Sequence, residues 1–362
     1  MVVILGIPLA VGLVMVAVLL LWSRGEPAPV VDASGRVVAG SLSEKVFVDV
    51  NGVRQGMFVV SRDVTNPVLL FLHGGPGMPE YFLAERYPTG LEDLFTVVWW
   101  DQRGAGLSYR PDIEPATMTV DQIVADTIAV TNHLRDRFGH DRIYLMGHSG
   151  GSFFGILAAA RAPELYHAYV GVAQMSHQLA SEMASYDYML QSYREAGDAT
   201  MVRRLESAPP TATGPLPAPY LAVRDAAMHG LGVGTTREMR SVVTGVFLPS
   251  WLSRSYTVSE KLNLWRGKAF SARLLRDAMF ATDLTRQVTE LDLPVYFVHG
   301  RHDHTVSYDG ARSFFTMLDA PVKGFYTFDA SAHSPLFEEP ARMRSILADD
   351  VLGARLTLAD PR

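Results

Sequence analysis

Residues 142–162 have the sequence RIYLMGHSGGSFFGILAAARA, in which an apolar run is interrupted by three glycines around Ser149 and then resumes. Glycine weakens a strand and loses much backbone entropy on folding, so this clustering needs a structural reason. A Gly-x-Ser-x-Gly pattern at 147–151, between a strand and a helix, is typical of a sharp turn that exposes the serine hydroxyl at the edge of a sheet. The stretch predicts a strand, a tight turn that carries Ser149, and a helix.

The other strands of the predicted sheet are continuously apolar rather than alternating. They are PVLLFLHG (67–74), FTVVWWD (95–101), AYVGVA (168–173), PVYFVHG (294–300) and GFYTFD (324–329). Strands of this kind are buried on both faces, which indicates a mainly parallel sheet with helices on each side. Thr119 and Gln122 predict the capped start of a helix that ends near Phe138. The fold class is therefore predicted to be α/β.

Two shorter signals complete the predicted organisation. Alternating runs on either side of Asn51-Gly52 indicate a β-hairpin, because this dipeptide accepts the positive φ angles of tight turns. The region between AYVGVA and PVYFVHG is helical in pattern and predicts an inserted cap, whose proline-rich stretch 209–219 is interpreted as a stiff loop rather than a recognition ligand. The predicted divisions are a transmembrane anchor (1–23), a linker (24–44), the first part of the core (45–174), the cap (175–285) and the second part of the core (286–362).

The N-terminal run 2–22 carries no charged residue and is long enough, as a helix, to cross the hydrocarbon core of a bilayer. A cleaved secretory signal would have a basic start and a shorter apolar stretch, so an uncleaved single-pass anchor is the preferred interpretation over a signal or a buried helix. Arg24 and Arg36 on one side favour a cytoplasmic body only weakly, and the side of the membrane stays open.

Composition excludes several classes of function. The 362-residue chain has a formal net charge of −6, so it lacks the basic surface that nucleic-acid binding requires. It contains no cysteine, which excludes disulfides, thiolate nucleophiles and cysteine-ligated zinc. We expect no nucleic-acid partner, and the sequence gives no indication of the oligomeric state.

A serine nucleophile needs a histidine base and an orienting carboxylate, which follow it in the order serine, acid, histidine in this type of sheet. Asp303 follows the buried strand 294–300, at the edge where α/β sheets place their sites. Only His304 and His333 come after Asp303, and His304 is too close in sequence to receive its orienting bond from that carboxylate. We therefore predict catalytic roles for Ser149, Asp303 and His333.

A cluster of histidines near Asp303 could instead suggest a metal site. His299, His302 and His304 surround this aspartate, but they share one short loop without the i, i+4 spacing of a helical ligand pair. We therefore expect no metal at this position.

Acyl transfer also requires hydrogen-bond donors for the developing oxyanion. The backbone amide of Gly150 is one candidate, because it follows the nucleophile, and the glycine-rich loop FLHGGPG at 71–77 follows an earlier strand as a second donor should. A phosphate-binding loop is the alternative interpretation of 71–77, but its Lys and Ser/Thr are missing.

Taken together, HGGPG (73–77), DQRGAGLS (101–108), GHSGGS (147–152), GRHD (300–303) and SAHSPLFEEP (331–340) resemble the proline iminopeptidase branch of the α/β-hydrolase superfamily. The similarity spans roughly residues 45 to 350. It implies an α/β-hydrolase fold with a helical cap, a triad of Ser149, Asp303 and His333, an oxyanion hole from the Gly75 and Gly150 amides, and no cofactor. Asp101 and Arg103 are expected to brace loops.

The chain departs from that family at two positions. Gly150 stands where members that remove N-terminal proline usually have Trp, and Ala332 stands where they usually have Gly. Acidic cap residues hold the substrate amine in the family, and the candidates for that role are Glu182, Glu195, Glu206, Glu238 and Glu260. The cap contains slightly more Lys and Arg than Asp and Glu.

The resulting hypothesis is a membrane-anchored serine hydrolase that cleaves amide bonds through an acyl-enzyme, as an aminopeptidase or small-amide hydrolase of the proline iminopeptidase type. An esterase or lipase acting on apolar acyl esters is the alternative. A lyase or acyltransferase with the same triad, and a binding module without catalysis, complete the possibilities.

Overall fold

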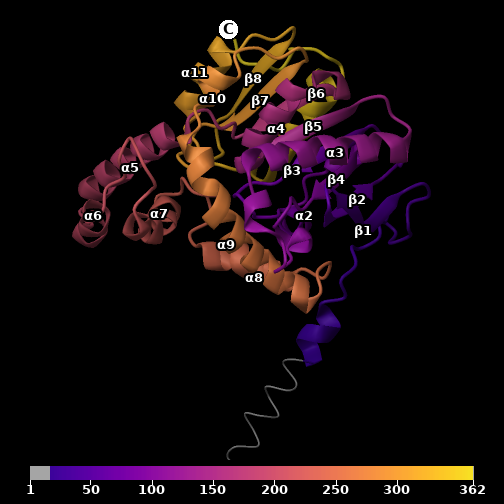
Figure 1. The fold of residues 1–362 in the computed structure, drawn as a ribbon, viewed down its shortest axis with the longest axis horizontal. Coiled ribbons are helices and arrows are strands. Elements are labelled where there is room, and N and C mark those ends of the chain that lie inside the picture. Colours follow the sequence, from indigo (N-terminus) through magenta and orange to yellow (C-terminus); the bar gives the residue numbers. More distant parts are fainter. Residues whose placement is uncertain (1–16, 362) are drawn as a thin grey trace, which may run out of the picture.

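A twisted sheet of eight strands in the order β1-β2-β4-β3-β5-β6-β7-β8 forms the centre of the computed structural model, which describes residues 17–361 (Figure 1). Strand β2 is antiparallel to β1 and β4, and all other neighbours are parallel. The strands are β1 (Leu42–Val50), β2 (Val53–Ser61), β3 (Val68–Leu72), β4 (Thr96–Trp100), β5 (Ile143–His148), β6 (Tyr166–Val172), β7 (Val295–Gly300) and β8 (Lys323–Phe328). The prediction of a mainly parallel α/β sheet is confirmed.

The predicted hairpin at the start of the domain is also confirmed. Val50 of β1 pairs with Val53 of β2, which leaves a two-residue turn at Asn51-Gly52. Both turn residues have positive φ, 45° and 79°, as a tight turn with the twist of the flanking strands requires.

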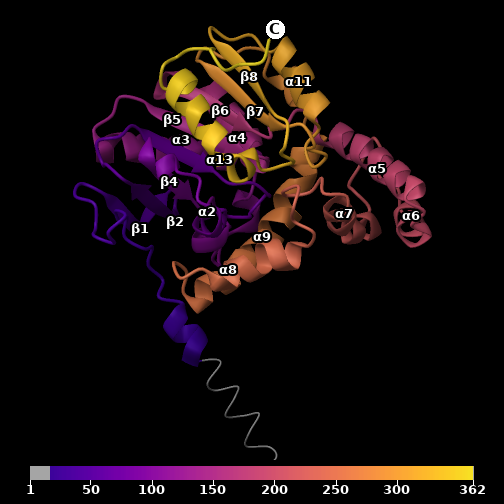
Figure 2. The same ribbon diagram turned by 180° about the vertical axis from the view of Figure 1, so that it is seen from behind.

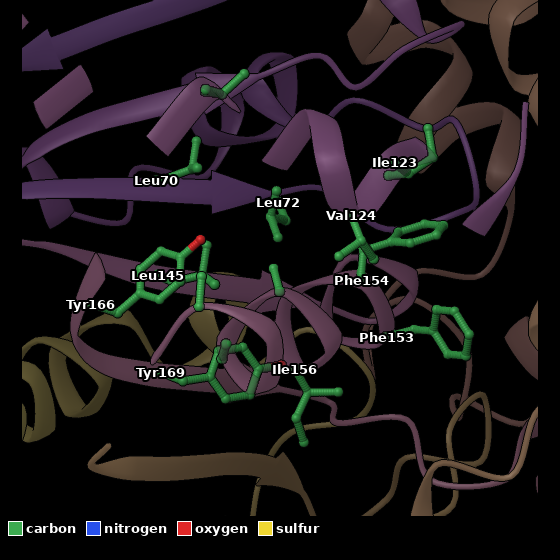
Figure 3. Close-up of a cluster of buried hydrophobic side chains, with 14 of the residues drawn as sticks. Leu70, Leu72, Ile123, Val124, Leu145, Phe153, Phe154, Ile156, Tyr166 and Tyr169 are labelled. Atoms are coloured by element: carbon green, nitrogen blue, oxygen red, sulfur yellow. The ribbon is translucent and has the colours of Figure 1, made fainter. Parts of the chain in front are cut away.

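Alternate residues of each strand point to opposite faces of the sheet. They form two hydrophobic cores, and helices cover both faces. Leu70, Leu72 and Leu145 pack with Phe154 of α4 in one core, shown in Figure 3. Their neighbours along the strands, such as Phe71, face the second core on the opposite side. The helices outside the cap are α2 (Tyr81–Arg86), α3 (Val120–Phe138), α4 (Gly150–Arg161), α11 (Tyr308–Met317), α12 (Pro335–Glu338) and α13 (Pro340–Ile346).

Helix α3 begins and ends where the sequence predicts. The Thr119 side chain accepts a hydrogen bond from the backbone of Gln122 at the N-terminus of the helix. The Gln122 side chain does not complete a reciprocal capping box, because it donates to Asp126 one turn further along. One of the two hydrogen bonds expected at the N-terminus of this helix is therefore formed, and the reciprocal one is not.

The chain leaves the sheet after β6 and returns at β7, and the intervening segment forms a helical layer beside the carboxyl ends of the strands (Figures 1 and 2). We call this layer the cap. Its helices are α5 (Gln178–Glu195), α6 (Ala199–Glu206), α7 (Ala218–Gly230), α8 (Leu248–Leu252), α9 (Val258–Ala281) and α10 (Leu284–Gln287). Most of the proline-rich stretch 209–219 lies in the loop between α6 and α7.

The start of the described chain contacts the cap. The Trp22 indole N–H donates to the carbonyl of Leu252 (2.7 Å), and Lys261 Nζ donates to Ser23 Oγ (2.8 Å). Part of the predicted linker is thus packed, since the Gly25 amide donates to the Arg254 carbonyl. The predicted transmembrane segment lies largely outside the described residues, and within 17–361 no helix combines the length and apolarity needed to cross a bilayer.

Candidate functional site

Ser149 occupies a strained turn between β5 and α4. Its φ and ψ are 54° and −122°, a conformation that side-chain-bearing residues rarely adopt outside functional sites. Glycines make the turn possible: a Cβ at Gly151 would lie 2.0 Å from the Leu72 carbonyl oxygen, and one at Gly147 would lie 2.4 Å from the Gly151 carbonyl oxygen. The predicted strand, turn and helix are all present, and the backbone explains each flanking glycine.

Asp303 and His333 meet although 30 residues separate them. Asp303 Oδ2 lies 2.9 Å from His333 Nδ1, and Oδ1 accepts hydrogen bonds from the Thr305 and Val306 amides. His299 Nε2 approaches the same Oδ2 at 3.2 Å. Burial alone would raise the pKa of Asp303, but the charge and hydrogen bonds of His333 and His299 outweigh it and hold that pKa below its ordinary range. The carboxylate therefore stays ionised against the imidazole.

His333 and Ser149 line the same cavity. Burial lowers the pKa of His333 despite the neighbouring Asp303 carboxylate, so the imidazole is neutral at pH 7, as a general base must be. Within residues 17–361, Ser149 Oγ makes no hydrogen bond to His333. Hydrogen bonds of this kind are often long in sites without substrate and shorten when it binds.

The glycine-rich loop 73–77 is held against the nucleophile turn. The Gln102 amide donates to His73 Nε2 (3.1 Å), which places the His73 proton on Nδ1, where it donates to the Gly74 carbonyl (2.9 Å). Burial lowers the pKa of His73 to about 4, consistent with this neutral tautomer. The loop is thus fixed by a buried, uncharged histidine.

The two predicted oxyanion donors, Gly75 and Gly150, lie side by side. A Cβ at Gly150 would be 2.9 Å from the Gly75 carbonyl oxygen and 3.2 Å from the Gly75 nitrogen, and Gly75 itself has a φ of 117°. Neither amide donates a hydrogen bond to another residue in the described part of the chain. The loop therefore packs so closely against Gly150 that a side chain at this position would require the loop to shift.

A buried ion pair that sequence reasoning missed connects the catalytic loops. The Glu80 carboxylate lies 2.8 Å from His148 Nδ1 and also accepts from the Gly74 amide (2.7 Å), while His148 Nε2 lies 2.9 Å from the His333 carbonyl oxygen. Both ring nitrogens of His148 face acceptors, so the charged imidazolium satisfies them best. Burial opposes that charge, but Glu80 outweighs it and raises the pKa of His148. The pair ties together the glycine loop, the nucleophile turn and the histidine loop.

Glu338 fixes the loop that carries His333 through hydrogen bonds to its backbone. Its Oε1 accepts from the Ala332 and Ser334 amides on either side of His333, and its Oε2 accepts from the Arg237 amide of the cap. Burial raises the pKa of Glu338 to about 7, because the three backbone donors only partly compensate for lost hydration. The loop therefore makes these hydrogen bonds to Glu338 with Ala332 at the position where the family usually has Gly.

The cavity in front of Ser149 has a volume of about 310 Å³ and lies between the sheet and the cap. This is at the lower end of the range for small-molecule sites, which favours a small substrate. The cap contributes four charged side chains to its lining: Arg224, Asp225, Lys268 and Arg276. Asp225 is half-exposed, and its pKa lies below the ordinary value because the charges of Arg224 and Lys268 outweigh its burial.

None of the five glutamates predicted as candidates for binding the substrate amine lines this cavity in the described structure. Glu182 is fully buried and paired with Arg224, which also contacts Asp225. Glu206 pairs with Arg194 and Glu260 with Lys45, in both cases away from the cavity. The remaining two, Glu195 and Glu238, are exposed. Asp225 was missed because the prediction considered only glutamates.

Asp101 and Arg103 act as braces, as the resemblance implied. Asp101 accepts from the Leu107 amide (2.7 Å) within its own loop. Arg103 forms a buried ion pair with Asp126 (2.6 Å) and donates to the Asn51 carbonyl (3.1 Å). Both residues hold loops beside the cavity without lining it.

The other histidines near Asp303 have structural partners. His299 Nε2 also lies near the Val306 carbonyl oxygen (3.1 Å), and His304 stacks on Tyr188 with 3.7 Å between ring centroids. Among residues 17–361, no group of three or more histidine and acidic side chains is arranged to hold a metal ion.

Comparison with known proteins gives consistent results. The profile of the family described as "Serine aminopeptidase, S33" matches residues 91–340, which include Ser149, Asp303 and His333. The chain is 31% identical over 301 residues to "Probable aminopeptidase YbaC" of Bacillus subtilis strain 168, covering 83% of this chain and 93% of that protein. It is 24% identical over 310 residues to a proline iminopeptidase of Heyndrickxia coagulans, covering 84% and 96%. The crystal structure of the proline iminopeptidase of Mycobacterium smegmatis has a TM-score of 0.59 at 20% identity and covers 86% of this chain and 98% of its own.

Proposed function

The chain belongs to the serine aminopeptidase S33 family of α/β-hydrolases, and from this premise we propose that it removes the N-terminal residue of short peptides through an acyl-enzyme on Ser149. The observation that carries the proposal is the 2.9 Å contact of Asp303 with His333, whose imidazole lines the same cavity as Ser149. A serine without a nearby neutral histidine would be inert.

In the proposed reaction, His333 takes the proton of Ser149 while the serine oxygen attacks the scissile carbonyl. The ionised Asp303 orients the imidazole and stabilises the imidazolium that forms. The amides of Gly75 and Gly150 then donate to the oxyanion of the tetrahedral intermediate, and their value comes from being free and fixed before the reaction begins. His333 protonates the leaving amine, and water releases the acyl group by the same steps.

Recognition of a free N-terminus needs an anion near the acyl group, and Asp225 is the proposed one. It is the cap carboxylate that lines the cavity among residues 17–361, and its lowered pKa keeps it charged at pH 7. Glu182 cannot serve as well, because it is fully buried and does not line the cavity. Asp225→Asn should therefore raise KM for peptides with a free amine.

The experiment compares amide and ester substrates on the purified full chain. Alanyl and prolyl p-nitroanilides should be hydrolysed, their N-acetylated forms should not, and Ser149→Ala should abolish turnover. A fluorophosphonate probe should label the wild type and not Ser149→Ala. Labelling of Ser149 together with hydrolysis of p-nitrophenyl acyl esters alone would replace the aminopeptidase with the esterase alternative.

We also propose that the uncharged run 2–22 attaches the enzyme to a membrane. Its last residues lie in the described structure, where Leu20 and Leu21 are exposed and the Trp22 indole donates to the Leu252 carbonyl of α8. The Leu248 and Leu252 side chains, one turn apart on α8, are also exposed. Together they form an apolar surface of the kind that suits a lipid interface.

Membrane extraction of the full chain tests this attachment. Introducing Leu13→Arg and Val16→Arg should release the protein into the alkaline supernatant, because each arginine costs about 2.5 to 3.5 kcal/mol at the centre of a membrane helix. The matched pair Leu13→Ala and Val16→Ala should stay with the membrane. Retention of the arginine variant would contradict the proposal.

A further inference from the structure

Two cations on the cavity wall, Lys268 and Arg276, have no acidic partner within hydrogen-bonding distance among residues 17–361, although Lys268 Nζ lies 5.4 Å from the centre of the Trp265 ring. Lys268 and Arg276 both line the cavity, yet Lys268 forms no hydrogen bond or ion pair among residues 17–361. The nearest acidic group to Arg276 is Asp277 at 3.9 Å, beyond hydrogen-bonding distance, and Arg276 Nε is buried without an acceptor. A buried donor without an acceptor is costly, which points to a missing anionic partner.

The position of these side chains follows from helix geometry. Lys268, Ala272 and Arg276 are spaced four residues apart on α9, so they form one stripe, and all three line the cavity. The small Ala272 leaves space between the two cations, which lie about 12 Å apart along the helix axis. A ligand group between them can be reached by both long side chains.

Helix α9 is fixed directly against the catalytic loops. A Cβ at Gly77 would lie 2.5 Å from Ser271 Cβ, and one at Gly267 would lie 2.8 Å from the Gly104 carbonyl oxygen. Ser271 Oγ also donates to the Gly104 carbonyl. This close packing holds the stripe next to the loop that carries Gly75, on the wall of the same cavity that Ser149 lines.

Arg224, another cation of the cap that lines the cavity, does have acidic partners. Arg224 is paired with both Glu182 and Asp225, and its guanidinium donates to the Glu182 carboxylate from two nitrogens. The charge of Lys268 helps to lower the pKa of Asp225, but no hydrogen bond or ion pair joins the two residues. The cavity thus retains uncompensated positive charge on its α9 wall.

We infer that Lys268 and Arg276 form a subsite for the free α-carboxylate of a short peptide, which makes the enzyme selective for dipeptides and similarly short peptides. This inference rests on the proposed function. The α-carboxylate of a dipeptide lies one residue from the scissile carbonyl, and the cavity of about 310 Å³ is at the lower end of the range for small-molecule sites. Ammonium and carboxylate are then recognised at separate places, by Asp225 and by the α9 stripe.

The test compares each peptide with its C-terminal amide, which removes only the negative charge. For the full-length wild type, alanyl-alanine and prolyl-alanine should have a kcat/KM at least about tenfold above that of alanyl-alaninamide and prolyl-alaninamide, since a charge-assisted hydrogen bond is lost. Lys268→Met with Arg276→Met should reduce this ratio to about one. Arg266→Met, on the exposed face of the same helix, should leave the ratio unchanged.

The possible outcomes separate the two proposals. Equal turnover of acid and amide by the wild type would overturn the carboxylate subsite and leave the aminopeptidase standing, and this comparison needs no variant to fold. Failure to cleave any of the four compounds, with Ser149 still labelled by the fluorophosphonate probe, would overturn the proposed function and the subsite with it. A preference for the acid that survives in the double variant would assign carboxylate recognition elsewhere.

Discussion

The charge of His148 should set the acid limb of the pH–rate profile. The imidazole rings of His148 and His333 have centroids 5.0 Å apart, and the positive charge of His148 lowers the pKa of His333. Glu80→Gln removes the anion that sustains this charge. The introduced amide can still accept from the Gly74 amide and donate to His148 Nδ1, so the hydrogen-bonded geometry is preserved while His148 becomes neutral.

The size of the effect follows from that separation. Two unit charges at 5 Å interact by about 0.8 kcal/mol at the dielectric constant of water and by about 3 kcal/mol at an effective value of 20. At 1.36 kcal/mol per pKa unit, these limits correspond to about 0.6 and about 2.4 units. The pKa of His333 should therefore rise by on the order of one unit in Glu80→Gln. Because the base must be neutral, activity is lost at a higher pH on the acid side.

The assay is kcat/KM for one p-nitroanilide from about pH 4.5 to 9, since the acid limb of this parameter reports the base of the free enzyme. The wild-type limb should lie below the ordinary histidine value of about 6.5, and the variant limb should move upward. Glu238→Gln, at an exposed cap position, is the matched control and should not move it. An unchanged or lower limb in a Glu80→Gln protein with normal thermal stability would show that His148 is neutral and refute the reasoning.

Three further predictions concern the loops around the site. Glu338 has a folded-state pKa of about 7, above the ordinary 4.5, so its contribution to stability is complete below about pH 4.5 and is lost as pH rises through 7. As pH is lowered from about 8 to 4.5, the free energy of unfolding of the wild type, measured with denaturant, should therefore rise by on the order of 3 kcal/mol relative to that of Glu338→Gln. A difference between the two proteins that does not change with pH would contradict this. Gly150→Trp should lower kcat/KM about a hundredfold or more, because even a Cβ there would meet the Gly75 carbonyl oxygen at 2.9 Å and displace the oxyanion loop; activity close to wild type would mean that the loop yields freely. Ser149→Gly should be more stable than Ser149→Ala by about 1 kcal/mol in thermal unfolding, since glycine relieves the positive φ of 54°, and equal stabilities would show that the turn stores no strain.

Local sequence signals predicted the fold because they are short-range. The Asn51-Gly52 turn and the continuously apolar strands each depend on a few adjacent residues, and both occur as predicted. Chain order selected Asp303 and His333 out of many acids and histidines, and the structure places them 2.9 Å apart. These inferences needed no knowledge of how distant segments pack.

Partners that come from distant segments could not be predicted in this way. Glu80 reaches His148 across 68 residues, and Arg224 neutralises Glu182 across 42. No local pattern marks either contact. The i, i+4, i+8 spacing of the stripe on α9 is visible in the sequence, but which face of that helix borders the cavity is decided by the glycine contacts of the cap with the catalytic loops.

The distribution of charge around Ser149 is also compatible with the proposed binding of a charged substrate by the cap. Buried ions are tolerated when paired, and the acids nearest the reaction have histidine partners: Glu80 with His148, and Asp303 with His333. The cations of the α9 stripe are only partly buried, so the cost of their charge is moderate. In the proposed subsite a substrate carboxylate would pair with them as it excludes solvent, which makes desolvation of the site conditional on the correct ligand. An amidated peptide would leave the same cations desolvated and unpaired, and it should bind weakly for that reason alone.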